Sequence, residues 1–129
     1  MSDVVKMLAV DLGASNGRVI LGILENGVLK LHEVHRFSND PVMVNGNLYW
    51  DVLRLVHEIK QGVLNCVRLG NRDISSIAID AWGVDFGLLD RQGNLLSNPY
   101  HYRDKRTDGM IDKIQEQISK EELYNITGI

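Results

Sequence analysis

The sequence predicts an α/β domain: a mixed sheet that opens with an antiparallel meander of three strands and carries helices on its flanks. Three apolar, β-branched runs follow one another closely at residues 4–11, 17–24 and 28–37. A helical stripe of apolar residues then spans residues 52–67, and a fourth apolar run at residues 74–80 completes a strand–helix–strand unit. With 129 residues, the chain is long enough to bury one core.

Composition and charge are those of an ordinary globular protein, and they argue against several classes of partner. The 14 basic and 17 acidic residues give a net charge of −3 and form no basic cluster, so we expect no nucleic-acid partner. No apolar run is long enough to cross a bilayer, so we expect no membrane partner. The one cysteine, Cys66, excludes an internal disulfide and fits a reducing compartment, which makes the cytoplasm the expected location.

The three opening strands are predicted from apolar runs and turn residues. Residues 4–11 form a nearly continuous apolar run, which is typical of a central strand buried on both faces. After the second strand, the pair Asn26-Gly27 indicates a tight hairpin turn into the third. The Gly/Ser-rich segment at residues 13–17 is therefore the first connection of the meander.

A small hairpin and a long helix follow the third strand. A second Asn-Gly pair, Asn45-Gly46, indicates the hairpin. Asp51 is the predicted N-cap of the helix, Gly62 indicates close packing within it, and Gly70 is its predicted end. The apolar stripe of this helix consists of Val52, Leu55, Val56, Ile59, Val63, Cys66 and Val67.

The last part of the chain adds one more sheet strand and two helices. Because residues 74–80 follow a crossover helix, we expect this strand to lie beside the first strand and parallel to it. Residues 86–90 are expected to form a hairpin through the turn at residues 91–94. Two helical segments come after residue 107, and the second begins with a capping box, Ser119 and Glu122. This order of elements is that of a ribonuclease-H-like half-domain.

The segment "AVDLGASNGR", residues 9–18, favours a phosphate-binding hairpin over two other nucleotide loops. A Walker loop needs glycine, four residues and then Gly-Lys-Ser/Thr, which the chain lacks. A dinucleotide-binding loop opens a helix, whereas an apolar strand pattern follows Arg18. In the third kind of loop, small residues let backbone N–H groups approach a phosphate.

The side chains of this segment suit the same chemistry. Ser15 and Asn16 can add donors, and Arg18 can contact a phosphate or a neighbouring carboxylate. Asp11 ends a buried strand, where a carboxylate is costly unless it is solvated or bound to a cation such as hydrated Mg²⁺. A plain Gly-rich hairpin with Asp11 as a turn former is equally consistent with the composition.

A second group of residues follows the fourth strand. Trp82 and Gly83 lie where that strand is expected to end, between Asp80 and Asp85. Ligands of open α/β sheets bind beyond the carboxyl ends of parallel strands, so this bend and Asp11 are expected to share one edge. An indole beside carboxylates suits a sugar, although a lone tryptophan is more commonly a core residue.

Two further sets of residues carry weaker signals. The polar and aromatic loop "YHYRDKRTDG", residues 100–109, is by itself typical of a salt-bridged surface. His32, His35 and His57 have no partners at metal-ligand spacing, so a structural metal is not expected. Cys66 lies on the apolar stripe of the helix and is interpreted as a packed thiol.

Taken together, these segments resemble a known family. "AVDLGASNGR" resembles the first phosphate motif of the superfamily of sugar kinases, Hsp70 and actin, whose members share the actin-like ATPase fold. "IDAWGVDFGLLD" followed by "YHYRDKRT" is similar to the FGGY carbohydrate kinases, and within them to the branch that acts on L-rhamnulose. "EVHRFSN", "NGNLYWDV" and "LYNITGI" are also similar to that branch, so the resemblance extends over nearly the whole chain.

The resemblance implies ATP and Mg²⁺ as cofactors and a role for several residues of this chain. Contacts to the ATP phosphates are implied for Ala14, Ser15, Asn16, Gly17 and Arg18. Asp11 is implied near the metal, which it would bind through water. Gly83 is implied as a sugar contact, with Asp85 and Tyr102 in the same pocket. Two positions depart mildly from the family: Asn16 replaces a second serine, and Ala81 stands where threonine is common.

The resemblance also implies that the chain is the N-terminal part of a first kinase domain. Family chains are several times as long, and their general-base aspartate and adenine-binding segment lie in parts that would follow Ile129. No catalytic residue is therefore expected among residues 1–129, and the fragment alone is expected to be inactive. It is also expected to self-associate through surfaces that the rest of the domain would cover.

The function expected for the intact protein is transfer of a phosphoryl group from ATP to the 1-hydroxyl of L-rhamnulose, with the sugar and ATP as its small-molecule partners. Another FGGY ketose or polyol kinase is an alternative, as is a non-catalytic relative that binds a sugar or a nucleotide. A third alternative is a ribonuclease-H-like nuclease in which Asp11, Asp80 and Asp85 hold two metal ions.

Overall fold

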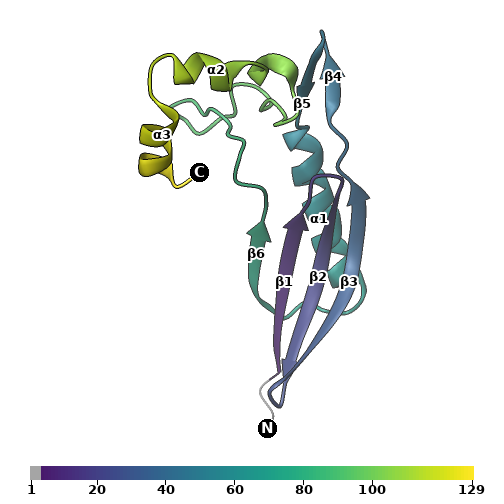
Figure 1. Ribbon diagram of the computed structural model, residues 1–129. Helices are drawn as coiled ribbons and strands as arrows, with labels where there is room; N and C mark the ends of the chain where they lie inside the picture. Colours follow the sequence, from purple (N-terminus) through teal and green to yellow (C-terminus); the bar gives the residue numbers. More distant parts are fainter. Residues whose placement is uncertain (1–3) are drawn as a thin grey trace.

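The computed structural model describes residues 4–129, and its main body is a mixed four-stranded sheet with one long helix against it (Figure 1). The strands lie in the order β3-β2-β1-β6. Antiparallel pairing joins β1 to β2 and β2 to β3, whereas β1 and β6 are parallel. These elements are β1 (Val5–Leu12), β2 (Asn16–Glu25), β3 (Val28–Ser38), the crossover helix α1 (Val52–Arg68) and β6 (Ile74–Asp80). The predicted meander and the parallel fourth strand are both confirmed.

Smaller elements lie beyond the edge of the sheet toward which β1 and β6 point (Figure 1). They are the hairpin β4 (Val42–Val44) and β5 (Asn47–Tyr49), the 3₁₀ turn η1 (Lys105–Thr107), and the helices α2 (Met110–Gln115) and α3 (Lys120–Thr127). No helix within residues 4–129 is long and apolar enough to cross a bilayer.

The turns and caps predicted from single residues form as expected. Asn26 and Gly27 have φ angles of 51° and 77°, and the second pair, Asn45-Gly46, has nearly the same values, 50° and 81°. Two consecutive positive φ angles define the tight turn that matches the twist of paired strands. The Asp51 carboxylate accepts a hydrogen bond from the Arg54 N–H at the start of α1.

The region after β6 differs in part from its prediction. The hairpin expected for residues 86–90 through the turn at residues 91–94 is reduced to that turn and one antiparallel bridge, Leu89 to Leu95, without extended strands. Its turn is held by the Asp90 carboxylate, which accepts hydrogen bonds from the N–H groups of Gln92 and Asn94. The Asn94 side chain adds a further bond to Asp90, and these bonds hold the pKa of Asp90 below its ordinary value.

The core lies between α1 and one face of the sheet. Its buried members are Leu8, Val10, Val19, Leu21 and Cys66. Gly62 of α1 allows the close approach, because an added Cβ would lie 2.8 Å from the Val19 Cβ and closer still to one of its methyl groups. The prediction that Gly62 marks close packing is therefore confirmed.

The buried face of α1 is rotated relative to the predicted stripe. Val56, placed on the stripe, is 44% exposed, whereas Glu58, which was not, is only 6% exposed. Glu58 is retained inside because His35 Nε2 donates to it over 2.6 Å and the Arg54 guanidinium also binds it. Burial by itself would raise the pKa of Glu58, but these two hydrogen bonds hold it below its ordinary value.

The prediction that the first strand is buried on both faces is wrong for the described residues. Leu8 and Val10 face α1 and are buried, but Ala9 on the opposite face is exposed. That opposite face is an apolar hollow of about 250 Å³. Its lining includes Met7, Ala9, Ile20, Gly22, Leu29, Leu31 and Ala78. The apolar run correctly indicated a central strand, but no described element covers its second face.

Substitution of Gly62 by alanine is expected to lower the free energy of unfolding by about 1–3 kcal/mol, because the new methyl group overlaps Val19 in the centre of the sheet. This loss is expected to exceed the gain of about 1 kcal/mol in helix propensity. Urea denaturation measures the difference. In a Val19→Ala background the same substitution should cost much less, and a Gly62→Ala variant as stable as its parent would contradict the packing described here.

Candidate functional site

Two loops begin at the same edge of the sheet because β1 and β6 are parallel neighbours. Asp11 lies directly opposite Asp80 in their pairing register. The turn at residues 13–15 follows β1, and the segment that contains Trp82 and Gly83 follows β6. The arrowheads of both strands point to this edge in Figure 1. The two predicted binding segments are therefore brought to one side of the sheet.

The turn after β1 presents free backbone donors at its tip. The Gly13 N–H donates to the Asn16 carbonyl oxygen over 2.9 Å. In contrast, the N–H groups of Ala14 and Ser15 donate to no other group within residues 4–129. Ser15 is exposed and Ala14 half-buried, so a ligand can reach this position. Successive free N–H groups of this kind form an anion-binding site.

The charges beside the turn are paired across the sheet. Arg18 Nε donates a hydrogen bond to Asp11 Oδ2 over 2.8 Å, and Arg18 Nη2 forms an ion pair with the same oxygen at 2.7 Å. Arg18 thus contacts the neighbouring carboxylate, one of its two predicted partners. Asp11 Oδ1 has no hydrogen-bond donor among the residues that the structure describes, and the side chain is 39% exposed. Asp11 therefore keeps one accessible oxygen at the carboxyl end of β1.

The end of β3 supports the turn from behind. Phe37 packs its ring against Gly17, where an added Cβ would lie 2.8 Å or less from three ring atoms. Arg36 Nη1 donates to Asn16 Oδ1 over 2.9 Å, which leaves the Asn16 NH₂ group as a donor. Buried Asn39, the residue after Ser38 at the end of β3, makes two hydrogen bonds to carbonyl oxygens of the turn.

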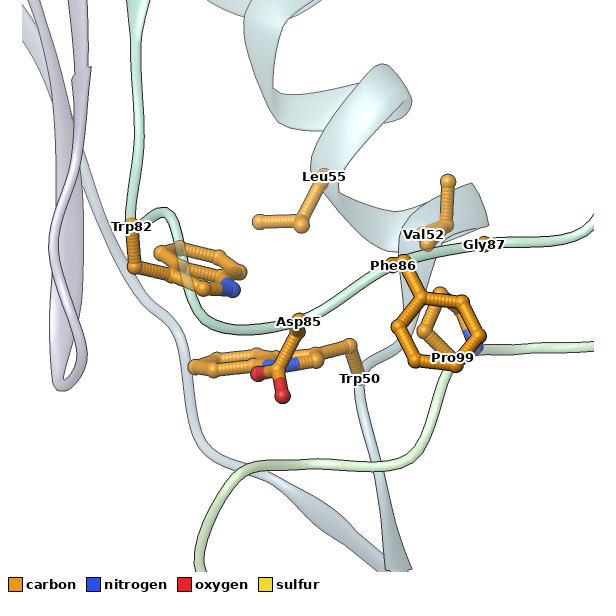
Figure 2. A pocket seen from close by; sticks show the side chains of 8 residues that line it. All are labelled: Trp50, Val52, Leu55, Trp82, Asp85, Phe86, Gly87 and Pro99. Atoms are coloured by element: carbon orange, nitrogen blue, oxygen red, sulfur yellow. The ribbon is translucent and has the colours of Figure 1, made fainter. Parts of the chain in front are cut away.

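The segment after β6 is organised around the buried side chain of Trp50. Its indole stacks on Trp82, with ring centroids 3.9 Å apart, and packs against the His101 ring, with centroids 4.0 Å apart and a tilt of 35° between the ring planes. Trp50 Nε1 donates to Asp85 Oδ2 over 2.5 Å, and the Tyr102 N–H donates to the same oxygen over 3.2 Å. Figure 2 shows the two indoles stacked, with the Asp85 carboxylate beside the ring of Trp50.

A small pocket of about 110 Å³ opens beside these rings (Figure 2). Its lining consists of Trp50, Val52, Leu55, Trp82, Asp85, Phe86, Gly87 and Pro99. Gly83, next to Trp82, is exposed, and a Cβ added there would meet no atom of residues 4–129 within 4 Å. The pocket is mainly apolar with one carboxylate, which is the composition of small-molecule binding pockets in general.

The loop at residues 100–109 is fixed to β5 through His101 and Asp104, so its interpretation as a surface segment is wrong in part. The His101 N–H donates to the Leu48 carbonyl oxygen over 2.9 Å, and Asp104 Oδ2 accepts the Leu48 N–H over 2.6 Å. His101 and Asp104 are buried, while Arg103 and Arg106 are exposed. Hydrogen bonds from Leu48 and Arg106 lower the pKa of Asp104 below its ordinary value.

His101 is the buried histidine of this loop. Its Nδ1 accepts the Arg103 N–H over 3.0 Å, so the neutral ring carries its proton on Nε2. Burial lowers the pKa of His101, which favours that neutral form. Within residues 4–129, Nε2 has no hydrogen-bond partner. His101 therefore contributes a flat, uncharged ring to the stack around Trp50.

The carboxylates named in the nuclease alternative do not form a metal cluster. Asp85 uses an oxygen to accept hydrogen bonds from Trp50 and Tyr102. Asp11 and Asp80 are neighbours in register, but one oxygen of Asp11 is bound by Arg18. In the part of the chain that the structure describes, no three His, Cys, Asp or Glu side chains are grouped so as to hold a metal ion. The structure gives the nuclease alternative no support.

Three residues that organise this region were not singled out by the sequence. Trp50 and Asn39 bind segments 35 and 26 residues away along the chain, and Glu58 pairs with a histidine 23 residues away. Trp50 lies directly before the helix cap and Asn39 directly after a strand. Residues without a structural role are common at both kinds of position, so neither position was a signal in the sequence. Only the glutamate inside an apolar helix face was a usable signal, because a buried carboxylate needs a partner.

Comparison of the sequence with known proteins identifies close relatives. The profile of the FGGY family of carbohydrate kinases, N-terminal domain, matches residues 6–129. Rhamnulokinase of Oceanobacillus iheyensis is 51% identical over 95% of this chain and 26% of the relative. Rhamnulokinases of Mannheimia succiniciproducens and Bacteroides thetaiotaomicron are 45% and 48% identical over similar shares. The chain thus spans about a quarter of the length of these relatives.

Solved structures of sugar kinases share the fold. Gluconate kinase of Lactobacillus acidophilus superimposes with a TM-score of 0.77 at 13% identity, over 95% of this chain and 25% of that one. Xylulose kinase of the same organism gives 0.75 at 13% identity, over 93% and 24%. The predicted α/β fold of sugar kinases is confirmed. Since the family profile covers nearly the whole sequence and relatives reach 51% identity, the chain belongs to the FGGY family of carbohydrate kinases.

Proposed function

We propose that this chain supplies the phosphate-binding turn and part of the sugar site of a kinase that transfers a phosphoryl group from ATP to the 1-hydroxyl of L-rhamnulose. One observation carries the proposal: free backbone donors at Ala14 and Ser15 and the aromatic segment at Trp82 begin at the same edge of the sheet. A phosphoryl donor and a hydroxyl acceptor must meet in this way for transfer. The choice of sugar is supported by the names of the relatives.

In this proposal the turn binds the phosphates of ATP. The N–H groups of Ala14 and Ser15 donate to phosphate oxygens, and the Ser15 hydroxyl and Asn16 NH₂ group add further donors. Gly17 lets Phe37 pack tightly beneath the turn, which restricts its conformations. Arg18 forms an ion pair with Asp11, and its partly exposed guanidinium is proposed to donate to a phosphate oxygen as well.

Asp11 fits the role of a metal-binding carboxylate. Its Oδ1 has no donor within residues 4–129, and the side chain is partly exposed at the end of a strand. A carboxylate of this kind suits Mg²⁺ that keeps most of its water ligands. Bound Mg²⁺ supplies neutralisation of phosphate charge. Asp11 would orient its waters, while Arg18 holds the carboxylate in place.

The segment after β6 is proposed to hold the sugar. Exposed Gly83 lets a hydroxyl approach the backbone, and the half-buried Trp82 ring offers a face for sugar C–H groups. Tyr102, whose ring packs against His101 and the Arg103 guanidinium, is proposed to line the same pocket. Asp85 uses Oδ2 to fix Tyr102 and Trp50, which leaves Oδ1 for a sugar hydroxyl. The role of Asp85 is thus partly to position the rings and partly to accept a hydrogen bond.

The other groups that the reaction needs are assigned, in this proposal, to the roughly three quarters of each relative's sequence that this chain does not match. We propose that the carboxylate that takes the proton from the sugar hydroxyl and the groups that bind adenine lie there. Residues 1–129 would then be the N-terminal part of the first domain and inactive alone. The proposed substrates, ATP and a free ketose, are those of an enzyme of the cytoplasm.

The activity is tested in a chimera, in which this chain replaces the matched segment of the Oceanobacillus iheyensis rhamnulokinase. The chimera is expected to phosphorylate L-rhamnulose in preference to D-xylulose, glycerol and D-gluconate, as measured by coupled ADP release. Preference for another member of this panel would shift the assignment to another FGGY kinase. A chimera that binds ATP and sugar but does not turn over, beside an active parent enzyme, would refute the kinase assignment for this chain.

Substitution of Asp11 by asparagine in the chimera is expected to reduce kcat by about 100-fold or more, because the metal loses its charged partner. Steady-state kinetics at several Mg²⁺ concentrations measure the effect. Lys6→Gln, which removes the exposed Lys6–Asp73 ion pair at the other end of β1, is the control and should leave kcat unchanged. Near-parental turnover of the Asp11 variant would exclude the metal role.

Substitution of Gly83 by alanine is expected to raise KM for the ketose about tenfold, which corresponds to about 1.4 kcal/mol of lost binding. The KM for ATP should not change. Within residues 4–129 the added methyl group meets no atom within 4 Å, so the melting temperature should also be unchanged. An unaltered KM for the sugar would place the substrate away from Gly83.

A further inference from the structure

We propose that Asn39 is a positioning residue for the nucleotide: it sets the direction of two peptide groups in the turn, so that N–H groups and not carbonyl oxygens face the phosphates. This inference rests on the proposed role of the turn in binding ATP. Asn39 itself lies behind the turn, at the end of β3, and is 5% exposed.

Two hydrogen bonds join Asn39 to the turn. Its side-chain Nδ2 donates to the Gly13 carbonyl oxygen over 2.8 Å. Its backbone N–H donates to the Ser15 carbonyl oxygen over 3.1 Å. The two accepting oxygens belong to the residues on either side of Ala14, whose own N–H group donates to nothing within residues 4–129. One buried residue therefore holds both sides of the tip.

Because the peptide group is planar, a hydrogen bond that fixes the direction of its C=O bond also fixes the direction of its N–H bond. In a trans peptide the C=O and N–H bonds point in opposite directions. When Asn39 draws the Gly13 oxygen toward itself, the Ala14 N–H must face away from Asn39. The same reasoning applies to the Ser15 oxygen and the Asn16 N–H. A reversal of either peptide would replace a donor by a carbonyl oxygen, which repels a phosphate.

The neighbouring contacts do not replace this function. Phe37 packs against Gly17, and Arg36 binds the side chain of Asn16, so neither contacts the peptide group between Gly13 and Ala14. The Gly13 oxygen accepts no bond from the Asn16 N–H, the usual partner across a two-residue hairpin loop, anywhere in the described range. The Asn39 side chain is therefore the partner that fixes this peptide.

Substitutions at Asn39 separate positioning from general stability. Asn39→Ala removes the side-chain donor and keeps the backbone N–H. Asn39→Asp keeps the shape but places a carboxylate oxygen against the Gly13 oxygen. In the chimera described above, both variants are expected to raise KM for ATP, and Kd for ADP measured by calorimetry, at least tenfold. The KM for L-rhamnulose should remain within twofold of the parent value.

Two control variants separate positioning from other effects. Cys66→Ala removes a buried core side chain away from the turn, so it should lower the melting temperature without changing KM for ATP. Ser38→Ala alters the exposed residue next to Asn39, whose hydroxyl binds Asp40, and should change neither quantity. A stability loss alone therefore does not produce the expected pattern.

The possible results are distinct. Unchanged nucleotide affinity in both Asn39 variants, or equal increases of the ATP and sugar KM values, would overturn the inference. Loss of ATP affinity in Cys66→Ala to the same degree would also overturn it, because a general loss of stability would then explain the result.

If the unmodified chimera binds ATP without phosphorylating sugar, the proposed activity fails, and the ADP affinities of the Asn39 variants still decide this inference. If it binds no nucleotide, both proposals fail.

Discussion

The parallel pairing of β1 with β6 is the constraint on which the other features depend. It places Asp11 opposite Asp80, so the loops after these strands must begin at the same edge of the sheet. A parallel pair requires a crossover, and α1 provides it while covering one face of the sheet. Close packing of α1 through Gly62 and the salt-bridged Glu58 therefore contribute indirectly to the site, because they hold the strands whose ends form it.

Both candidate binding segments are held from behind by buried side chains of one stretch, residues 37–50. Phe37 and Asn39 at its start support the phosphate-binding turn, and Trp50 at its end supports the aromatic segment through Trp82 and Asp85. Groups that face a ligand keep a fixed direction when the residues behind them are held in place by their own packing and hydrogen bonds. One piece of chain between a strand and a helix thus positions a proposed nucleotide site and a proposed sugar site together.

Features that depend on neighbouring residues could be predicted from the sequence, whereas features that depend on distant contacts could not. The two Asn-Gly turns, the cap at Asp51 and the parallel strand after α1 follow from local chemistry and connection length. The rotation of α1 toward Glu58 needed knowledge of His35, and the roles of Asn39 and Trp50 depend on partners far along the chain. The open face of β1 could not be foreseen, since an apolar run indicates a buried face without showing what covers it.

The central claim is that the free N–H groups after β1 bind the phosphates of ATP while a sugar lies against the neighbouring strand end. A crystal structure of the chimera with a non-hydrolysable ATP analogue, Mg²⁺ and L-rhamnulose tests it most directly. The account predicts phosphate oxygens about 3 Å from the nitrogens of Ala14 and Ser15 and the ketose beside Gly83. Phosphates bound elsewhere, with these two N–H groups left in contact with water, would contradict it.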